Sequence, residues 1–113
     1  MSATISTHVL DTSRGLPAIG LMVTLEHHDG DAWVERGAGT TDADGRIRDL
    51  LPPSLFDFGV WRLTFHTKPW FAGHGVTSFY PEVVVHFEVT DASRHHHVPL
   101  LLNPFGYATY RGT

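Results

Sequence analysis

The chain contains no cysteine among its 113 residues, which excludes disulfide bonds and thiolate metal sites. It also lacks any run of basic residues. Its 8 lysines and arginines stand against 12 aspartates and glutamates, and the formal net charge is -4. Proteins that bind nucleic acid need a basic surface to neutralise phosphates, so we predict no nucleic-acid partner. The absence of cysteine suits a reducing compartment.

Long hydrophobic runs are missing as well. The longest wholly apolar stretches span a few residues, whereas a helix that crosses a bilayer needs about 20. Residues 1–8 lack the charged and then apolar pattern of a secretory signal. We therefore expect a soluble cytoplasmic protein with no membrane partner. The length fits one domain, residues 1–113, and a hydrophobic content of 42% supplies its core.

No segment carries a long amphipathic helical pattern. Short alternating runs of apolar and polar residues, broken by glycine, proline, asparagine and aspartate, predict β-strands instead. Residues 67–75 break the alternation and leave room for one short helix. Short strands separated by frequent turns predict an all-β, antiparallel sandwich. The eight expected strands cover residues 4–10, 19–28, 31–40, 46–48, 59–66, 82–89, 95–102 and 107–111.

Strand alternation and turn residues add local detail, because successive side chains of a strand point to opposite faces. Asp29-Gly30 follows the second strand and predicts a type I′ hairpin turn. Gly45 ends an aspartate-rich turn, where it is free to adopt the left-handed conformation. In the second strand one face comprises Ile19, Leu21, Val23 and Leu25.

Nine histidines are unusual beside so few lysines and arginines, and histidine moves protons readily near neutral pH. The apolar side chains of strand 95–102 share one face, which turns His95 and His97 outward. In strand 4–10, the apolar pair Ile5 and Val9 shares the core face, which leaves His8 on the other side. His8 and His97 are therefore expected on the outer side of a sheet.

Two interpretations of these outward histidines stay open: solvated surface residues, or members of a site. His95 and His97 stand two apart on one strand face and, with His8, have a spacing that can chelate zinc. The chain has no HExxH motif, cysteine or clearly paired carboxylate to support zinc, so we predict no metal ligand. Nucleotide-binding glycine motifs and a GxSxG nucleophile turn are also missing. His96 is expected to point inward.

Two further features are unusual. Arg46 directly follows Asp44-Gly45; a surface arginine beside a turn explains it, although its fork of donors also suits a planar, anionic ligand. Residues 104–113 are rich in aromatic residues and turn formers. Chain ends normally fray, and two tyrosines with an arginine are costly to leave loose there. We predict that this segment docks against the protein.

Several segments together resemble the transthyretin-like 5-hydroxyisourate hydrolase family over essentially the whole chain. The ending Tyr110-Arg111-Gly112-Thr113 is the most specific, because it separates the hydrolases from the hormone-carrying transthyretins. The other matching segments are Ser6-Thr7-His8-Val9-Leu10-Asp11, Gly15-Leu16-Pro17-Ala18, Thr41-Asp42-Ala43-Asp44-Gly45-Arg46, Phe79-Tyr80-Pro81-Glu82-Val83 and His97-Val98-Pro99-Leu100-Leu101-Leu102.

The resemblance implies a sandwich of two four-stranded sheets with one short helix. It also implies a homotetramer, a dimer of dimers, with sites at the dimer–dimer interface. By motif match, catalytic roles fall on His8, Arg46 and His97. Substrate-binding roles fall on Tyr110, Arg111, Gly112 and Thr113. The family usually has serine where this chain has Thr113; a hydroxyl and a terminal carboxylate are retained, so we expect function to survive.

The implied activity is cofactor-free hydrolysis of 5-hydroxyisourate, the unstable product of urate oxidation, to 2-oxo-4-hydroxy-4-carboxy-5-ureidoimidazoline in purine catabolism. His8 and His97 would form an acid–base pair, with the base unassigned, and Arg46 would orient the substrate and stabilise the oxyanion. Two alternatives share the fold: a transthyretin-type carrier of small ligands, and a structural domain of a larger surface protein. A carrier does not need these three residues or the Tyr-Arg-Gly-Thr ending. The absence of a signal pattern and a linker, and the polar residues grouped at the motif positions, argue against the structural domain.

Overall fold

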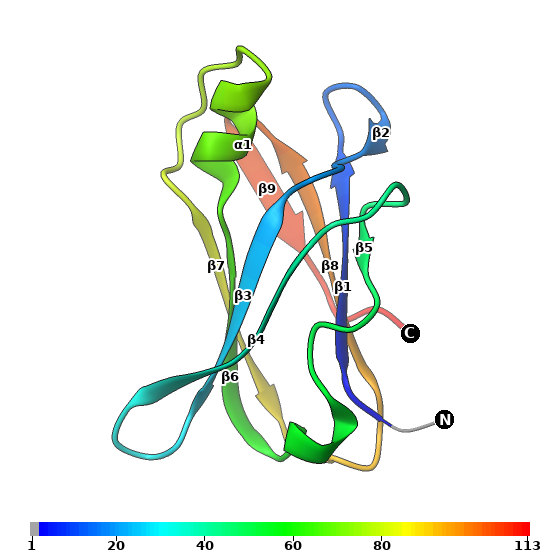
Figure 1. Ribbon diagram of the computed structural model, residues 1–113, viewed down its shortest axis with the longest axis vertical. Helices are drawn as coiled ribbons and strands as arrows, with labels where there is room; N and C mark the ends of the chain where they lie inside the picture. The colour runs from blue at the N-terminus through cyan, green and yellow to red at the C-terminus, as the bar shows by residue number, and fades with distance from the viewer. Residues whose placement is uncertain (1–2) are drawn as a thin grey trace.

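Two β-sheets packed face to face form the protein in this computed structural model, which describes residues 3–113 (Figure 1). Met1 and Ser2, the first two residues of the segment that lacks a signal pattern, lie outside the described residues. Within residues 3–113, no helix is long and apolar enough to cross a membrane. The elements in chain order are β1 (Ile5–Asp11), β2 (Leu16–Pro17), β3 (Met22–His28), β4 (Trp33–Thr40), β5 (Arg46–Ile47), the 3-10 helix η1 (Pro53–Leu55), β6 (Gly59–Phe65), α1 (Thr67–Gly73), β7 (Val83–Val89), β8 (His96–Asn103) and β9 (Gly106–Thr109).

The strand order explains how the two sheets are built. The first sheet has the order β2-β1-β8-β9, and β5 pairs with the edge of β1 that also holds β2. The second sheet has the order β4-β3-β6-β7. Every pair is antiparallel except β1 with β8, which is parallel. The predicted sandwich is confirmed, with five strands rather than four in the first sheet because two short strands share one edge of β1.

The core lies between the sheets, where alternate side chains of each strand meet. The predicted inward face is correct for β8, and β6 follows the same alternation. The buried rows are Trp61, Leu63 and Phe65 in β6, and Val98, Leu100 and Leu102 in β8. Burial of each such apolar side chain contributes about 1.5–3 kcal/mol to stability, so these rows hold the sheets together. His96 also points inward as predicted, with 5% of its surface exposed.

The predicted face shared by Ile19 with Leu21, Val23 and Leu25 is wrong for Ile19. Its side chain is 53% exposed, because β3 begins only at Met22 and Gly20, at φ 80°, turns the chain before it. The carbonyl of Ile19 instead accepts a hydrogen bond of 2.8 Å from Trp70 Nε1. Trp70 belongs to α1, the short helix predicted within 67–75, which lies at one end of the sandwich (Figure 1).

The predicted type I′ turn at Asp29-Gly30 is also wrong. Such a turn needs positive φ at both residues, and Gly30 has it at 104°, whereas no non-glycine residue of the described chain does. The Asp29 carboxylate accepts hydrogen bonds from the backbone N–H groups of Asp31 and Ala32, at 3.1 and 3.0 Å. These hydrogen bonds stabilise a longer loop from Asp29 to Ala32, and β4 therefore begins at Trp33.

Candidate active site

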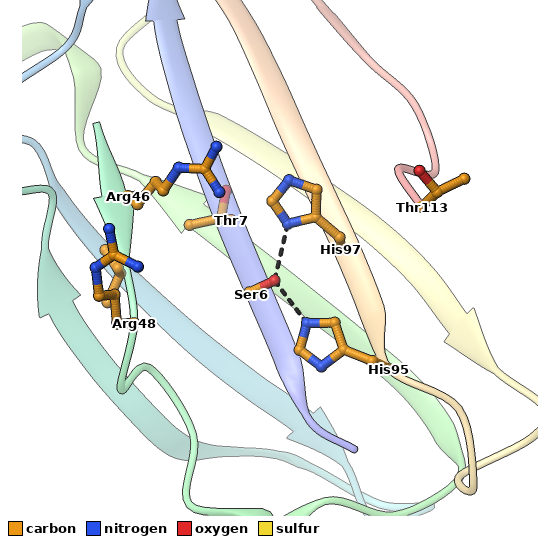
Figure 2. Close-up of a pocket in the computed structure, with 8 residues that line it drawn as sticks. Ser6, Thr7, Arg46, Arg48, His95, His97 and Thr113 are labelled. Carbon is orange, nitrogen blue, oxygen red and sulfur yellow. Dashed lines mark hydrogen bonds between the residues drawn. The ribbon is translucent and has the colours of Figure 1, made fainter. Parts of the chain in front are cut away.

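A depression of about 380 Å³ lies on the outward face of the first sheet. Side chains of β1, β5 and β8 line it, together with the segment that follows β9, as Figure 2 shows. The lining carries two histidines and two arginines. The lining residues are Ser6, Thr7, Arg46, Ile47, Arg48, His95, His97 and Thr113.

Strand pairing through β1 brings these residues together. In the parallel pair, Ser6 lies opposite His97 of β8. In the antiparallel pair, His8 lies opposite Arg46 of β5. Ser6 and His8 stand two apart on β1 and so share its outward face. His8 thus lies in register with Arg46 but is absent from the lining of the depression.

A tight turn positions Arg46. Asp42 Oδ1 accepts hydrogen bonds from the backbone N–H groups of Asp44 and Arg46, at 2.9 and 3.0 Å. The Arg48 guanidinium is engaged by Asp42 and Asp44 at 3.4 and 3.3 Å. Within residues 3–113, the Arg46 guanidinium enters no ion pair, so its donors face the depression without a protein carboxylate to occupy them.

Gly45 makes this turn possible. Its φ of 75° disfavours any side chain, and a Cβ there would lie 2.5 Å from the Val9 carbonyl oxygen. We expect Gly45→Ala to lower the free energy of unfolding by about 1–3 kcal/mol, measured by urea denaturation. Gly75→Ala is the matched control, because Gly75 has a similar φ of 71° in open space. Equal losses for the two variants would contradict the role assigned to the close approach at Val9.

His97 is held from two sides. Its Nδ1 lies 2.8 Å from Ser6 Oγ, and its backbone carbonyl accepts a hydrogen bond of 2.8 Å from the Gly112 N–H. Burial lowers the pKa of His97, and the positive charges of Arg46, His8 and His95 lower it further. The ring is therefore uncharged at neutral pH, the form in which one nitrogen donates and the other accepts a hydrogen bond.

A pH titration tests this environment. We expect the His97 ring to titrate below pH 6.5 when its proton resonances are followed by NMR. Because the unfolded chain binds this proton at an ordinary pKa, stability falls as the pH drops from 6.5 towards the folded value. Arg46→Gln removes one of the cations facing the ring and should raise the midpoint. A His97 midpoint at or above 6.5 in the unmodified protein would contradict the effect of burial and nearby cations on this ring.

The final segment, residues 110–113, lines two separate hollows. Thr113 lines the depression, and Gly112 forms a bridge to His97. Tyr110 and Arg111 instead line a second hollow of about 240 Å³ between β7 and β8, which His97 also borders. Tyr110 is 57% exposed, so the segment is held chiefly through Gly112 and not through its aromatic side chain.

Gly112 packs directly on the His97 ring. A Cβ at this position would lie 2.6 Å from His97 Cδ2 and 3.2 Å from Pro99 Cγ. We expect Gly112→Ala to displace the ring or the segment, and to lower any activity that depends on their geometry by up to about 10²-fold. Gly106→Ala is the matched control, because its nearest neighbour would be the Asn103 side chain at 3.6 Å. An unimpaired Gly112→Ala variant in a steady-state assay would show that the contact is dispensable.

Ser6 and His95 are among the lining residues for which the sequence indicated no catalytic or substrate-binding role. Ser6 accompanies His97 only because β1 and β8 pair in parallel, which local sequence does not reveal. Strand alternation predicted that His95 shares the face of His97, but nothing in the sequence linked His95 to Ser6. Across residues 3–113, histidine, cysteine and acidic side chains form no group of three or more arranged to hold a metal ion.

Comparison with known proteins places the chain in a family. The sequence model of the HIUase/Transthyretin family matches residues 5–112. The chain belongs to this family. A relative named 5-hydroxyisourate hydrolase from Mus musculus is 43% identical over 114 aligned residues, which cover 99% of this chain and 97% of the mouse protein.

Solved structures of two functional kinds resemble the fold. The 5-hydroxyisourate hydrolase of Klebsiella pneumoniae superimposes with a TM-score of 0.82 at 35% identity, over 98% of this chain and 94% of that one. Sea bream transthyretin, solved in complex with thyroxine, gives a TM-score of 0.91 at 32% identity, over 96% and 94%. Backbone likeness therefore does not separate the two kinds, and function has to be argued from the side chains.

Proposed function

We propose that this chain hydrolyses 5-hydroxyisourate to 2-oxo-4-hydroxy-4-carboxy-5-ureidoimidazoline in urate degradation, and that residues 1–113 form one hydrolase domain. The observation that carries the proposal is the meeting of His97, Arg46 and Thr113 around one depression, with His8 in register beside Arg46. The 43% identity to the mouse hydrolase supports the same substrate.

The proposed reaction adds water across a ring amide bond. The water oxygen attacks the carbonyl carbon, the carbon–nitrogen bond breaks, and the released proton goes to the leaving nitrogen. His8 and His97 act as the acid–base pair, and such positioned proton transfer contributes about 10²–10⁴-fold. A histidine that is neutral at working pH can accept a proton and return it in a later step, which agrees with the lowered pKa of His97.

Arg46 and the final segment hold the substrate in this proposal. The unpaired guanidinium fork of Arg46 binds the planar, polar ring and stabilises the oxyanion of the tetrahedral intermediate. The hydroxyl of Thr113 holds the water or a polar edge of the substrate. Gly112 keeps this segment against His97, and Tyr110 and Arg111 line the second hollow beside it.

A carrier function is the second candidate, because the TM-score to sea bream transthyretin is the higher of the two. A carrier of an apolar ligand has no need of two histidines bridged by a serine or of a free arginine. The charged lining of the depression therefore favours the hydrolase.

We also propose that the chain acts as a homotetramer, a dimer of dimers with its sites at the dimer–dimer interface, in the cytoplasm. Large apolar side chains that are exposed on a single chain support a surface that other subunits cover. The more exposed of these side chains include Met22, Phe58, Phe79, Phe105 and Tyr110. The cysteine-free composition suits the reducing cytoplasm. Sedimentation analysis tests the assembly, and a monomer at assay concentration would contradict it.

The activity has a direct test. Purified protein is mixed with urate and urate oxidase, and the ultraviolet absorbance of the 5-hydroxyisourate intermediate is followed. We expect the intermediate to decay faster in proportion to the protein concentration. Decay at the spontaneous rate would refute the proposed function.

A further inference from the structure

A continuous chain of hydrogen bonds runs behind the His97 ring. The Thr4 backbone N–H donates to His95 Nδ1 at 3.2 Å. His95 Nε2 lies 2.8 Å from Ser6 Oγ, and Ser6 Oγ lies 2.8 Å from His97 Nδ1. Figure 2 shows Ser6 between the two rings, with the second nitrogen of His97 on the side away from the serine.

The first bond of the chain decides the direction of all the others. A backbone N–H can only donate, so His95 Nδ1 must be an unprotonated acceptor. The neutral His95 ring therefore carries its proton on Nε2 and donates it to Ser6 Oγ. The serine hydroxyl has a single proton, and with its oxygen already accepting from His95 it directs that proton to His97 Nδ1. The neutral His97 ring is then left with its proton on Nε2.

We propose that Ser6 and His95 are positioning residues that orient the His97 ring and set its tautomer, so that His97 presents an Nε2–H donor to the substrate. The reverse direction is disfavoured, because a proton on His95 Nδ1 would face the Thr4 N–H at 3.2 Å. Holding a reactive ring by its other nitrogen is how proteins fix both the orientation and the tautomer of a histidine.

The catalytic role of Ser6 and His95 rests on the proposed function, whereas the tautomer of His97 can be measured without any activity. A donor on Nε2 of the neutral ring suits a hydrogen bond to the carbonyl oxygen of the substrate, because complete transfer of that proton would leave an imidazolate. It does not suit abstraction of a proton from water in the same step. The Ser6–His95 pair therefore assigns His97 a hydrogen-bond donor role towards the substrate and leaves the first proton abstraction from water to His8.

The tautomer is measured without substrate. Long-range ¹H–¹⁵N correlation spectra, recorded above the His97 pKa and assigned with His97→Gln, distinguish a protonated from an unprotonated ring nitrogen. We expect His97 of the unmodified protein to be in the single Nε2–H form, and Ser6→Ala to give an exchange-averaged mixture. Ser6→Thr keeps a hydroxyl and should restore the single form. A His97 proton on Nδ1 in the unmodified protein, or an unchanged spectrum in Ser6→Ala, would overturn the proposal.

Turnover provides the second readout. We expect Ser6→Ala to lower kcat by about 10–100-fold with a smaller change in KM, as the loss of outer partners costs at other histidine sites. His95→Leu should act in the same direction, and His95→Gln, which returns an N–H donor, should recover part of the loss. Ser93→Ala is the matched control, because that hydroxyl bonds only to Asp91 on an exposed turn.

The two possible failures are separable. If the unmodified protein does not accelerate decay of 5-hydroxyisourate, the proposed function fails while the NMR result still decides the tautomer. If the unmodified protein is active and Ser6→Ala retains full kcat with an intact fold by circular dichroism, the positioning role is refuted and the proposed function stands.

Discussion

Replacing His97 with alanine is expected to lower kcat/KM for 5-hydroxyisourate by about 10²–10⁴-fold, the contribution of one positioned acid–base group. The ring is half-buried in the depression, bonded to Ser6 and packed against Gly112, so its removal takes away a hydrogen-bonding group that is held in place. The backbone bridge from His97 to Gly112 does not need the side chain and should persist. Stopped-flow absorbance at several substrate concentrations measures the loss.

His74→Ala is the control for this substitution. His74 is exposed directly after α1, where its Nδ1 lies 2.8 Å from the Trp70 carbonyl oxygen, and it lines neither the depression nor the second hollow. We expect it to retain activity and the same circular dichroism spectrum. If His97→Ala turned over at a near-normal rate with its fold and assembly intact, the assigned role of His97 would be wrong.

Replacing Arg46 with glutamine is the second large effect that we expect. Loss of a preorganised oxyanion donor typically lowers kcat by about 10²–10³-fold. Within the described residues, no carboxylate occupies the Arg46 guanidinium, and the turn around Gly45 aims it at the depression. Arg46→Lys keeps the charge but loses the fork, so it should recover only part of the rate if bidentate contact matters.

Arg36→Gln serves as the matched control, because Arg36 is an exposed arginine on β4 of the second sheet. Both arginine variants are compared in the same assay at saturating and low substrate. A loss confined to KM would mean that Arg46 binds substrate and transition state equally, which would contradict its role at the oxyanion.

Strand alternation predicted much of the fold because burial follows a period of two. The inward row of β8, the outward His97 and the inward His96 all follow from that period. The two local errors have local causes. Ile19 lies before a glycine turn, and the Asp29 side chain captures two backbone N–H groups that a tight hairpin would have left to the strands.

The arrangement around His97 was only partly predictable. Its outward face follows from alternation, whereas its neighbour Ser6 depends on parallel pairing between strands at opposite ends of the chain. No short-range pattern carries that information, because the two residues are separated by 91 positions. The resemblance to the family supplied the grouping of His8, Arg46 and His97, and the register of β1 with β5 and β8 supplies the physical reason.

The parallel pairing of β1 with β8 also has a consequence for biosynthesis. The contacts that join Thr4 and Ser6 to His95 and His97 span 89 to 91 residues, so they cannot form on the ribosome until β8 has emerged. Closing a loop of that length is slow, since its entropy cost precedes any stabilising contact. The second sheet, built from neighbouring strands β3, β4, β6 and β7, has no such requirement. We expect pulse-labelled hydrogen exchange during refolding to protect β3 and β6 before β1.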